Sequence, residues 1–372
     1  MRFIHTADWH IGRKLNGFDL IEDQKAIFQQ LVKIVQEAQV EAIVIAGDLY
    51  DRSLPSEEAV ETVNRMLFEL NRILGLPLLV ISGNHDSATR LATGRDWFKS
   101  TQFYLNTQLS EAFKSITIGD TQFFLLPYFE PSMARSYFKN EELRTLNQII
   151  PLVVKQMEEK FDPDKKHVLV GHFFAAGSTH TDSEILVNVG GLDSVALNDL
   201  EIFDYVALGH LHNHLAIKNE VVQYAGSLLK FSVSEAKQEK GVYLVDTQVG
   251  KRKFIPLTPM HDLQHLTKSF AELVATEFYH QISRQDYFAI SLTDENVIPN
   301  AMARLREIYE RIISLDRVNG VKVQHLRNSN AMNLDPLALL FEYYEEVTGH
   351  GLDEKQKKWA IETLNEIKEE NK

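Results

Sequence analysis

The sequence of 372 residues contains no cysteine. This absence excludes disulfide bonds, thiolate metal sites and cysteine nucleophiles, and it fits a reducing compartment. Long apolar runs are missing too, and the start shows neither a charged leader nor a cleavage signal. We therefore expect no membrane segment and a cytoplasmic location. Any active site must use oxygen and nitrogen groups.

Positive charge is in deficit, with 39 Lys and Arg against 52 Asp and Glu, a net charge of −13. This balance argues against the coating of nucleic acid by bulk electrostatics, while local basic patches remain able to contact phosphates. Some basic residues follow closely after the motifs described below, and they are either DNA-contact candidates or scattered solvated charges. They are Arg13, Lys14, Arg52, Arg90 and Arg95.

The sequence repeats one local pattern five times, a short apolar run that ends in metal-competent side chains. An apolar run of this length predicts a buried strand. Because the carboxyl ends of parallel strands lie at the same edge of a sheet, we expect all five ends to meet in one crevice. The runs are residues 3–6 before Asp8 and His10, 42–46 before Asp48, 78–81 before Asn84, 167–170 before His172, and 205–208 before His210 and His212.

The donor set at these five ends indicates a two-metal site. Carboxylates, an amide and imidazoles without thiolate suit Mn, Fe, Zn or Co, and one carboxylate can bridge two ions about 3.5 to 4 Å apart. Asp48, which is central in the order, is the natural bridge. Each motif alone has a plain alternative, such as a turn or a satisfied core histidine. Their joint occurrence at five strand ends favours the metal site.

The five motifs resemble those of the calcineurin-like metallophosphoesterases and cover residues 6–212. They read Asp8-x-His10, Gly47-Asp48-x-x-Asp51-Arg52, Gly83-Asn84-His85-Asp86, Gly171-His172 and Gly209-His210-x-His212. The resemblance implies an α/β fold, a double-sheet sandwich flanked by helices. It is strongest to nuclease subunits of double-strand-break repair complexes. It therefore implies DNA as substrate, an ATPase with a coiled coil as partner, and a homodimer within a heterotetramer.

The resemblance also assigns roles to individual residues. It implies that His85 is not a ligand and assists the transition state or the leaving oxygen. Asp51 stands where some relatives carry histidine, and it would orient His85 or simply belong to a turn. Asp86 completes the candidate catalytic residues. Two ions, expected to be Mn²⁺, would be held by Asp8, His10, Asp48 and His212 and by Asp48, Asn84, His172 and His210.

Two other functions remain open. The Asp51-Arg52 pair favours a phosphomonoesterase or protein phosphatase. A non-catalytic scaffold for an ATPase is the other alternative, although a vestigial site would be expected to lose some of its ligands. Activity on linear duplex DNA beside a generic phosphate monoester distinguishes these functions from a nuclease.

Helical spacing predicts further elements within the first 260 residues. Residues 20–38 form one amphipathic helix, which makes a βαβ unit with the strands on either side. Ser56 caps a second helix, and residues 131–160 form a polar helical connector with Met157 on its solvated face. Strands are expected at 123–126, and at 221–224 and 241–245, whose alternation suits sheet edges. The second helix buries Val60, Val63, Leu67, Leu70 and Leu74.

The composition changes near residue 260, after which no metal motif recurs. We therefore predict a nuclease domain at 1–260, an α+β capping domain at 261–333 and a helical arm at 334–372 that binds the ATPase. The capping domain is expected to have helices at 270–279 and 301–313 and strands at 287–292 and 321–324. The arm has two short helices joined at Gly349-His350-Gly351. Their apolar stripes are Leu337, Leu340, Phe341, Tyr344 and Val347, and Ala360, Leu364 and Ile367.

Overall fold

The structure is a computed structural model that describes residues 1–179, 181, 182, 184, 194–318, 337, 340, 341, 344 and 351–370, the last seven by their main chain alone. The chain divides into two compact units. Unit 1 comprises Met1–Gln264 and Gln285–Tyr287, and unit 2 comprises His265–Arg284 and Phe288–Lys372. The domain boundaries at 260 and 333 stay predictions.

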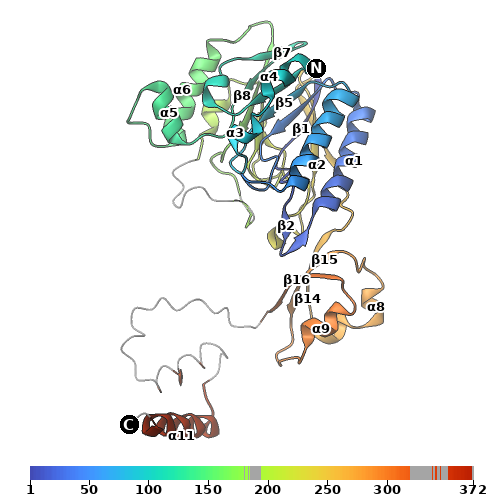
Figure 1. Cartoon of the computed structure of the whole chain (residues 1–372), viewed down its shortest axis with the longest axis vertical. Helices are drawn as coiled ribbons and strands as arrows, with labels where there is room; N and C mark the ends of the chain where they lie inside the picture. Colours follow the sequence, from blue (N-terminus) through green and yellow to red (C-terminus); the bar gives the residue numbers. More distant parts are fainter. Residues whose placement is uncertain are drawn as a thin grey trace. The chain divides into compact units, whose positions relative to one another are not determined.

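Unit 1 contains a six-stranded sheet in the order β13-β12-β1-β4-β5-β6, of which β1 and β5 are labelled in Figure 1. Strands β1, β4, β5 and β6 run parallel, and β12 and β13 are antiparallel to their neighbours. The expected edge position of residues 241–245 is wrong, because β12 lies between β13 and β1. The strands are β1 (Arg2–Thr6), β4 (Ala42–Ala46), β5 (Leu78–Ile81), β6 (Phe103–Asn106), β12 (Gly241–Asp246) and β13 (Lys251–Pro256).

A five-stranded sheet in the order β11-β10-β9-β8-β7 packs against the first. The core between them takes side chains from both sheets, among them Phe3 and Val44 from one and Phe123 and Val168 from the other. The expected double-sheet sandwich is confirmed, and β11 is at an edge as predicted. The strands are β7 (Ile116–Ile118), β8 (Thr121–Leu125), β9 (Lys166–His172), β10 (Tyr205–Gly209) and β11 (Val222–Tyr224).

Helices α1 (Ile21–Ala38) and α2 (Glu57–Phe68) lie side by side (Figure 1). The α1 helix joins parallel strands β1 and β4, which confirms the βαβ unit. The Ser56 side chain accepts a hydrogen bond from the Ala59 amide at 3.2 Å, which confirms the predicted cap. Residues Val63 and Leu70 are buried as expected, but Val60 is 37% exposed and its predicted inward position is wrong.

The segment predicted to be an exposed connector instead covers part of the core. Helix α6 (Leu146–Glu158) packs against residues of the five-stranded sheet, including Leu169 and Val206. Met157 is fully buried, so its predicted solvated position is wrong. The spacing of Ile149, Val153 and Met157 along the helix is the pattern that predicts a buried face.

Unit 1 has further short elements in its connections. They are β2 (Lys14–Leu15), β3 (Phe18–Asp19), η1 (Glu69–Ile73), α3 (Ala88–Leu91), α4 (Arg95–Phe98), η2 (Lys99–Thr101), η3 (Leu109–Glu111), α5 (Pro131–Phe138), η4 (Leu197–Leu200) and η5 (Val233–Glu235). The π-helical turn η1 continues α2, and Gly75 follows it with φ of 70°. A glycine adopts this left-handed conformation without steric cost, so it suits the end of the helix.

Beyond residue 260 the strands are β14 (Leu263–Lys268), β15 (Tyr287–Leu292) and β16 (Arg311–Arg317), which form a sheet in that order. The predicted strand at 287–292 is confirmed. The predicted helix at 270–279 is instead α7 (Phe270–Leu273) followed by α8 (Thr276–Tyr279). The prediction of a helix to residue 313 is wrong, because α9 (Ala301–Arg306) ends earlier and the β-branched Ile312 lies in β16.

Part of the predicted C-terminal structure lies outside the described residues. This is the case for the strand at 321–324, Val347 and the Gly349-His350 turn. Residues 337, 340, 341 and 344 are helical, and α11 (Glu354–Glu370) is the second predicted helix. Within the described residues, no helix has the length and apolarity needed to cross a membrane.

Candidate metal centre

The loops after five parallel strands bring together the polar residues that the sequence pattern singles out. Strands β1, β4 and β5 of the six-stranded sheet lead to Asp8 and His10, to Asp48, and to Asn84. Strands β9 and β10 of the other sheet lead to the remaining histidines, His172, His210 and His212. The expected convergence therefore occurs across both sheets of the sandwich.

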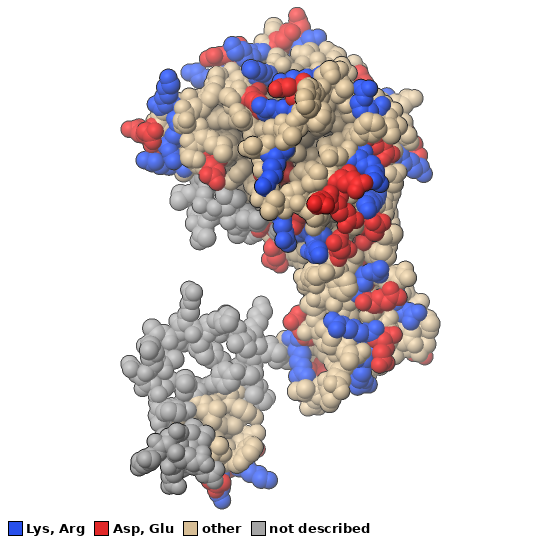
Figure 2. Space-filling model, in the orientation of Figure 1, with Lys and Arg blue, Asp and Glu red and all other residues tan. Residues whose placement is uncertain are grey.

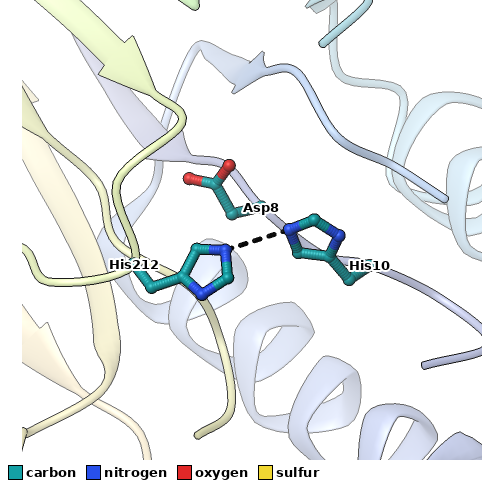
Figure 3. Close-up of side chains that lie close together, drawn as sticks. All are labelled: Asp8, His10 and His212. Atoms are coloured by element: carbon teal, nitrogen blue, oxygen red, sulfur yellow. Dashed lines mark hydrogen bonds between the residues drawn. The ribbon is translucent and has the colours of Figure 1, made fainter. Parts of the chain in front are cut away.

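The first donor group consists of Asp8, His10 and His212 (Figure 3). All three side chains are buried, and each offers a ligand atom within 4.8 Å of the other two. The rings of His10 and His212 face each other, with their Nε2 atoms 3.1 Å apart. Two neutral imidazoles cannot both point lone pairs at each other without a proton or cation between them. This arrangement suits a metal ion.

The second donor group consists of Asn84, His172 and His210. The Asn84 Oδ1 atom lies 2.9 Å from His172 Nε2 and 3.0 Å from His210 Nδ1. The Nδ1–H of His172 donates to the Ala46 carbonyl at 2.8 Å. That hydrogen bond fixes the tautomer, so Nε2 presents its lone pair to Asn84 and the rest of the group.

Asp48 lies between the two donor groups. Its Oδ2 atom is 3.7 Å from His10 Nε2 and 3.3 Å from His172 Nε2. The other carboxylate oxygen, Oδ1, accepts a hydrogen bond from the His85 amide at 2.8 Å. One oxygen of Asp48 thus faces a histidine from each group, which is the position that a bridging ligand requires.

Burial and the opposing charges tune these groups for binding a cation. Burial lowers the pKa of His10 well below its ordinary value and lowers the pKa of His210 to about 3, so both rings are neutral at pH 7. Burial raises the pKa of Asp8 to about 7. Burial opposes ionisation of Asp48 as well, but the charge and the hydrogen bond of His172 hold the pKa of Asp48 below its ordinary value. Burial opposes the charged form of His172 too, but the Asp48 carboxylate raises the pKa of His172 to about 9. The centre therefore combines the neutral rings of His10 and His210 with an ion pair between His172 and Asp48.

The backbone of the centre is strained at four of the ligand candidates. Their φ angles lie in the left-handed region, which residues other than glycine rarely adopt. The values are 51° at Asp8, 45° at His10, 53° at Asp48 and 92° at His210. Each such residue costs about 1–3 kcal/mol, and such strain concentrates at functional sites. The surrounding packing must therefore hold these side chains in position.

Two glycines make the close packing of the loops possible. A Cβ atom at Gly83 would collide with the Asp48 carboxylate, and one at Gly47 would collide with the His172 ring. Gly47 also has φ of 92°. The Gly-Asp and Gly-Asn pairs of the sequence are thus required by close approach and, at Gly47, by backbone conformation as well.

The buried polar atoms also fit the binding of metal ions. Within the described part of the chain, His10 Nδ1 and Ser178 Oγ are the buried side-chain polar atoms without a hydrogen-bond partner. The Asp51 Oδ1 atom lies 4.0 Å from His10 Nδ1. The donors are oxygens and nitrogens alone, a set that suits hard and borderline divalent cations.

His85 contacts the predicted orienting residue through the main chain. Its Nδ1–H donates to the Asp51 carbonyl oxygen at 2.7 Å, and its ring packs edge-on against His10 with the centroids 4.6 Å apart. The Asp51 carboxylate instead accepts a hydrogen bond from Arg13 Nη1 at 2.9 Å. The main chain of residue 51 thus holds the His85 ring, and the orienting role of the Asp51 side chain stays a prediction.

Asp86 binds main-chain amides of two loops. Its carboxylate accepts hydrogen bonds from the amides of Gly83 at 2.9 Å, Tyr50 at 3.0 Å and Leu49 at 3.2 Å. Burial raises its pKa to about 6. These contacts tie the loop that carries Asp48 to the loop that carries Asn84. They make Asp86 a positioning residue, and its predicted catalytic role stays a prediction.

The basic DNA-contact candidates differ in their surroundings. The Arg13 side chain is 18% exposed and lies 5.3 Å above the Phe231 ring, in addition to its pairing with Asp51. Arg52 is exposed, and Arg90 is exposed and donates to the Ser53 carbonyl at 2.9 Å. Lys14 pairs loosely with an exposed carboxylate, and Arg95 pairs with Glu111. Basic and acidic side chains alternate over the face of unit 1 drawn in Figure 2.

Three residues around His212 were missed by the sequence analysis. Glu184 Oε1 accepts a hydrogen bond from the His212 amide at 2.6 Å, and Glu235 Oε1 lies 3.4 Å from His212 Nδ1. Lys240 Nζ donates to the His212 carbonyl at 2.8 Å. None of them follows a strand in the repeated pattern, so no local signal marks them.

Comparisons with known proteins agree with this geometry. A model of calcineurin-like phosphoesterases matches residues 1–214. The chain belongs to the calcineurin-like phosphoesterase family. A second model, described as the type 5 capsule protein repressor C-terminal domain, matches residues 259–348. Membership of the calcineurin-like phosphoesterase family, together with the donor set, identifies the site as a centre for divalent metals.

Two relatives are similar over nearly their whole length. The D subunit of the nuclease SbcCD from Staphylococcus epidermidis is 34% identical over 359 residues, 96% of this chain and 96% of the relative. The D subunit of the nuclease SbcCD from Staphylococcus saprophyticus subsp. saprophyticus is 32% identical over 375 residues, 100% of this chain and 99% of the relative. The chain thus belongs to the family of these nuclease proteins. A solved dimetal phosphatase from Danio rerio superposes with a TM-score of 0.39 at 14% identity, over 66% of this chain and 91% of that one.

Proposed function

We propose that this protein is the metal-dependent nuclease subunit of an SbcCD-type complex and acts on DNA with an SbcC-type ATPase. The observation that carries the proposal is the position of Asp48, one oxygen of which faces a histidine from each donor group. Such an arrangement suits hydrolysis at phosphorus by two metal ions. The full-length similarity to the D subunits of SbcCD nucleases supports DNA as the substrate and the ATPase as the partner.

The proposed ligand assignment follows the two donor groups. Asp8, His10 and His212 with Asp48 would hold one ion, and Asn84, His172 and His210 with Asp48 the other. Two ions bound there would supply a water that loses its proton near neutral pH and would neutralise charge that develops on the phosphate oxygens. We propose Mn²⁺ for both positions, because the donors are oxygens and nitrogens without a thiolate.

His85 is the residue proposed to handle a proton during cleavage. Its Nδ1–H is donated to the Asp51 carbonyl, so the atom available for exchange with substrate is Nε2. We place Nε2 near the leaving oxygen, where it would deliver a proton as the P–O bond breaks. Exposed Arg52 and Arg90 lie in or beside the loops that position this histidine, and they are the proposed contacts to the DNA backbone.

The proposed architecture has a nuclease domain at 1–260, a capping domain at 261–333 and an arm at 334–372 that binds the ATPase. The described part of the arm has Trp359 and Ile361 exposed on α11, at 74% and 40%. Exposed apolar side chains on one helix suit binding of a partner helix. The net charge of −13 favours weak DNA binding by the isolated chain, with much of the affinity supplied by the partner.

Cleavage assays test the proposal directly. Linear duplex DNA, single-stranded DNA and a phosphate monoester would be incubated with metal-free protein, with Mn²⁺ restored, and with and without the ATPase. The proposal expects Mn²⁺-dependent cleavage of DNA and duplex cleavage stimulated by ATP. Efficient hydrolysis of the monoester without DNA cleavage would identify a phosphatase instead. DNA end processing that depends on the ATPase but not on the metal ligands would support the scaffold alternative.

A further inference from the structure

His212 is held by polar contacts at its main chain as well as its ring. Its amide donates to Glu184 and its carbonyl accepts from Lys240. At the ring, Nε2 faces His10 at 3.1 Å and Nδ1 lies 3.4 Å from Glu235 Oε1. The Nε2 side of the ring faces the proposed metal position, whereas the Nδ1 side faces Glu235.

Glu235 and Lys240 form a buried ion pair behind this ring. The two side chains have exposed fractions of 0% and 4%, and Glu235 Oε2 lies 2.5 Å from Lys240 Nζ. Lys240 also donates to Gln238 at 2.9 Å and to Ser227 at 3.0 Å. A buried ion pair is costly unless each charge is paired and hydrogen-bonded, and removal of one partner leaves the other charge uncompensated. This pair is well satisfied, and the other oxygen, Glu235 Oε1, faces His212 and also accepts a hydrogen bond from the Ser232 hydroxyl at 3.1 Å.

The charge of Glu235 determines which nitrogen of His212 carries the proton. An ionised carboxylate only accepts hydrogen bonds, so the nitrogen that faces it must be Nδ1–H. The Nε2 atom then has a free lone pair, which it directs toward His10 and the proposed ion. Carboxylates that accept the second N–H of a metal-bound histidine fix its tautomer and ring orientation in this way.

We infer that Glu235, held in place by Lys240, is a positioning residue that fixes the Nε2-ligating tautomer of His212. The inference rests on the proposed two-metal function and extends it to a pair that follows none of the five motifs. Glu235 also lies beyond residues 1–214, the part that the phosphoesterase family model matches. The inference predicts that Glu235 and Lys240 together control the affinity of one ion, the one held by the first donor group.

The variant Glu235→Gln tests this inference because it keeps the shape of the side chain. The Lys240 ammonium is a donor, so the new amide must present its oxygen to Lys240 and its NH₂ group to His212. The Nδ1 atom of His212 must then accept, which moves the ring proton to Nε2, the ligating atom. We expect one of two Mn²⁺ affinities to fall about 10- to 100-fold by isothermal titration calorimetry, with the other retained.

The double variant Glu235→Gln/Lys240→Met separates positioning from a merely structural role. Without the ammonium, the amide is free to turn its oxygen to His212 Nδ1–H, and the ligating tautomer returns. We expect the weakened affinity to recover to within about fivefold of the wild-type value, although the hydrogen bonds of Lys240 to His212, Ser227, Glu235 and Gln238 have been lost. If the ion pair is purely structural, the Mn²⁺ affinity of the double variant should be no higher than that of Glu235→Gln. That result would overturn the inference.

A matched control is available at Asp23, a buried carboxylate that also pairs with a histidine. Its Oδ1 atom lies 2.9 Å from His261 Nδ1, and its Oδ2 atom accepts from the Tyr287 hydroxyl at 3.0 Å. Asp23→Asn removes a comparable contact, but neither partner belongs to a donor group. We expect a lowered unfolding temperature with both Mn²⁺ affinities unchanged. Equal losses of metal affinity in Asp23→Asn and Glu235→Gln would attribute the effect to general destabilisation and refute the inference.

Ring-nitrogen chemical shifts in the metal-free protein give a second readout that does not depend on activity. Long-range ¹H–¹⁵N spectra should show His212 protonated at Nδ1 in the wild type and at Nε2 in Glu235→Gln. An unchanged tautomer would refute the inference even if cleavage were reduced. Failure of the wild-type protein to bind two divalent ions would instead refute the proposed two-metal function, so the two failures are distinguishable.

Discussion

Replacement of Asp48 by asparagine is the sharpest test of the shared ligand. The substitution keeps the size of the side chain, and its amide oxygen is still able to accept the hydrogen bond from the His85 amide, which Asp48 Oδ1 accepts at 2.8 Å. What it removes is the negative charge that faces His10 and His172. Both proposed ions should therefore be weakened together, whereas replacement of a ligand that belongs to one donor group should weaken one ion.

The size of the effect follows from the distances at Asp48. Its Oδ2 atom lies 3.3 and 3.7 Å from the facing histidine nitrogens, so an ion shared with either ring lies within about 4 Å of the carboxylate. At an effective dielectric constant of about 20, two unit charges at that distance interact by about 4 kcal/mol, which is a lower limit for a divalent ion. Since about 1.4 kcal/mol corresponds to a factor of ten, we expect each affinity to fall by at least about a thousandfold.

The assay combines metal content with cleavage. Wild-type and Asp48→Asn protein would be dialysed against a fixed free Mn²⁺ concentration, and bound metal counted by mass spectrometry beside cleavage of single-stranded DNA. We expect the variant to hold neither ion at a concentration that saturates the wild type, with no cleavage. Asp23→Asn serves as the control for the loss of a buried carboxylate. Two ions bound to Asp48→Asn with wild-type affinity would refute the bridging position.

Four further outcomes are expected. His85→Gln should keep both ions yet lose about 10²- to 10⁴-fold in turnover, since a group that moves a proton affects the chemical step; a parallel loss of metal would make it a ligand. Asp51→Asn retains the carbonyl that holds His85 and disturbs the pairing of the carboxylate with Arg13 and Arg52, so the rate should fall about tenfold or less, and a loss as large as that of His85→Gln would contradict this reasoning. Met157→Ala should destabilise the fold by about 2–5 kcal/mol in urea unfolding, whereas a surface position would cost almost nothing. Truncation after Asp335 should retain metal-dependent cleavage of single strands and lose binding to the ATPase, and co-purification of the truncated chain at full yield would disprove the arm's role.

Much of the centre was predictable because its candidate ligands follow a local rule. A short apolar run that ends in metal-competent side chains is visible in any short window, and the three-dimensional fold has only to align the ends. This is why Asp8, Asp48 and Asn84 were found without knowledge of how the sheets pack. The same holds for the Ser56 cap, which is made within one turn of its own helix.

Predictions failed where a local pattern had two solutions. The polar run after Met157 predicts a solvated position for this residue, yet Met157 lies on the face of α6 that covers a sheet. Ile312 and Ile313 continued a helical spacing, but they lie in a strand of the three-stranded sheet. Local propensity is weak beside the burial that packing provides, so tertiary contacts decided both cases.

The sequence by itself determined which side chains would meet, whereas the tertiary structure decided which atoms face one another. Residue 51 supports His85, but only the folded loop shows that its carbonyl does so while its carboxylate faces Arg13. Glu235 and Lys240 reach His212 from 23 and 28 residues away along the chain. Strand ends are set by burial patterns within a few residues, but contacts of this kind depend on how separate loops settle on two stacked sheets, and no local pattern encodes that geometry.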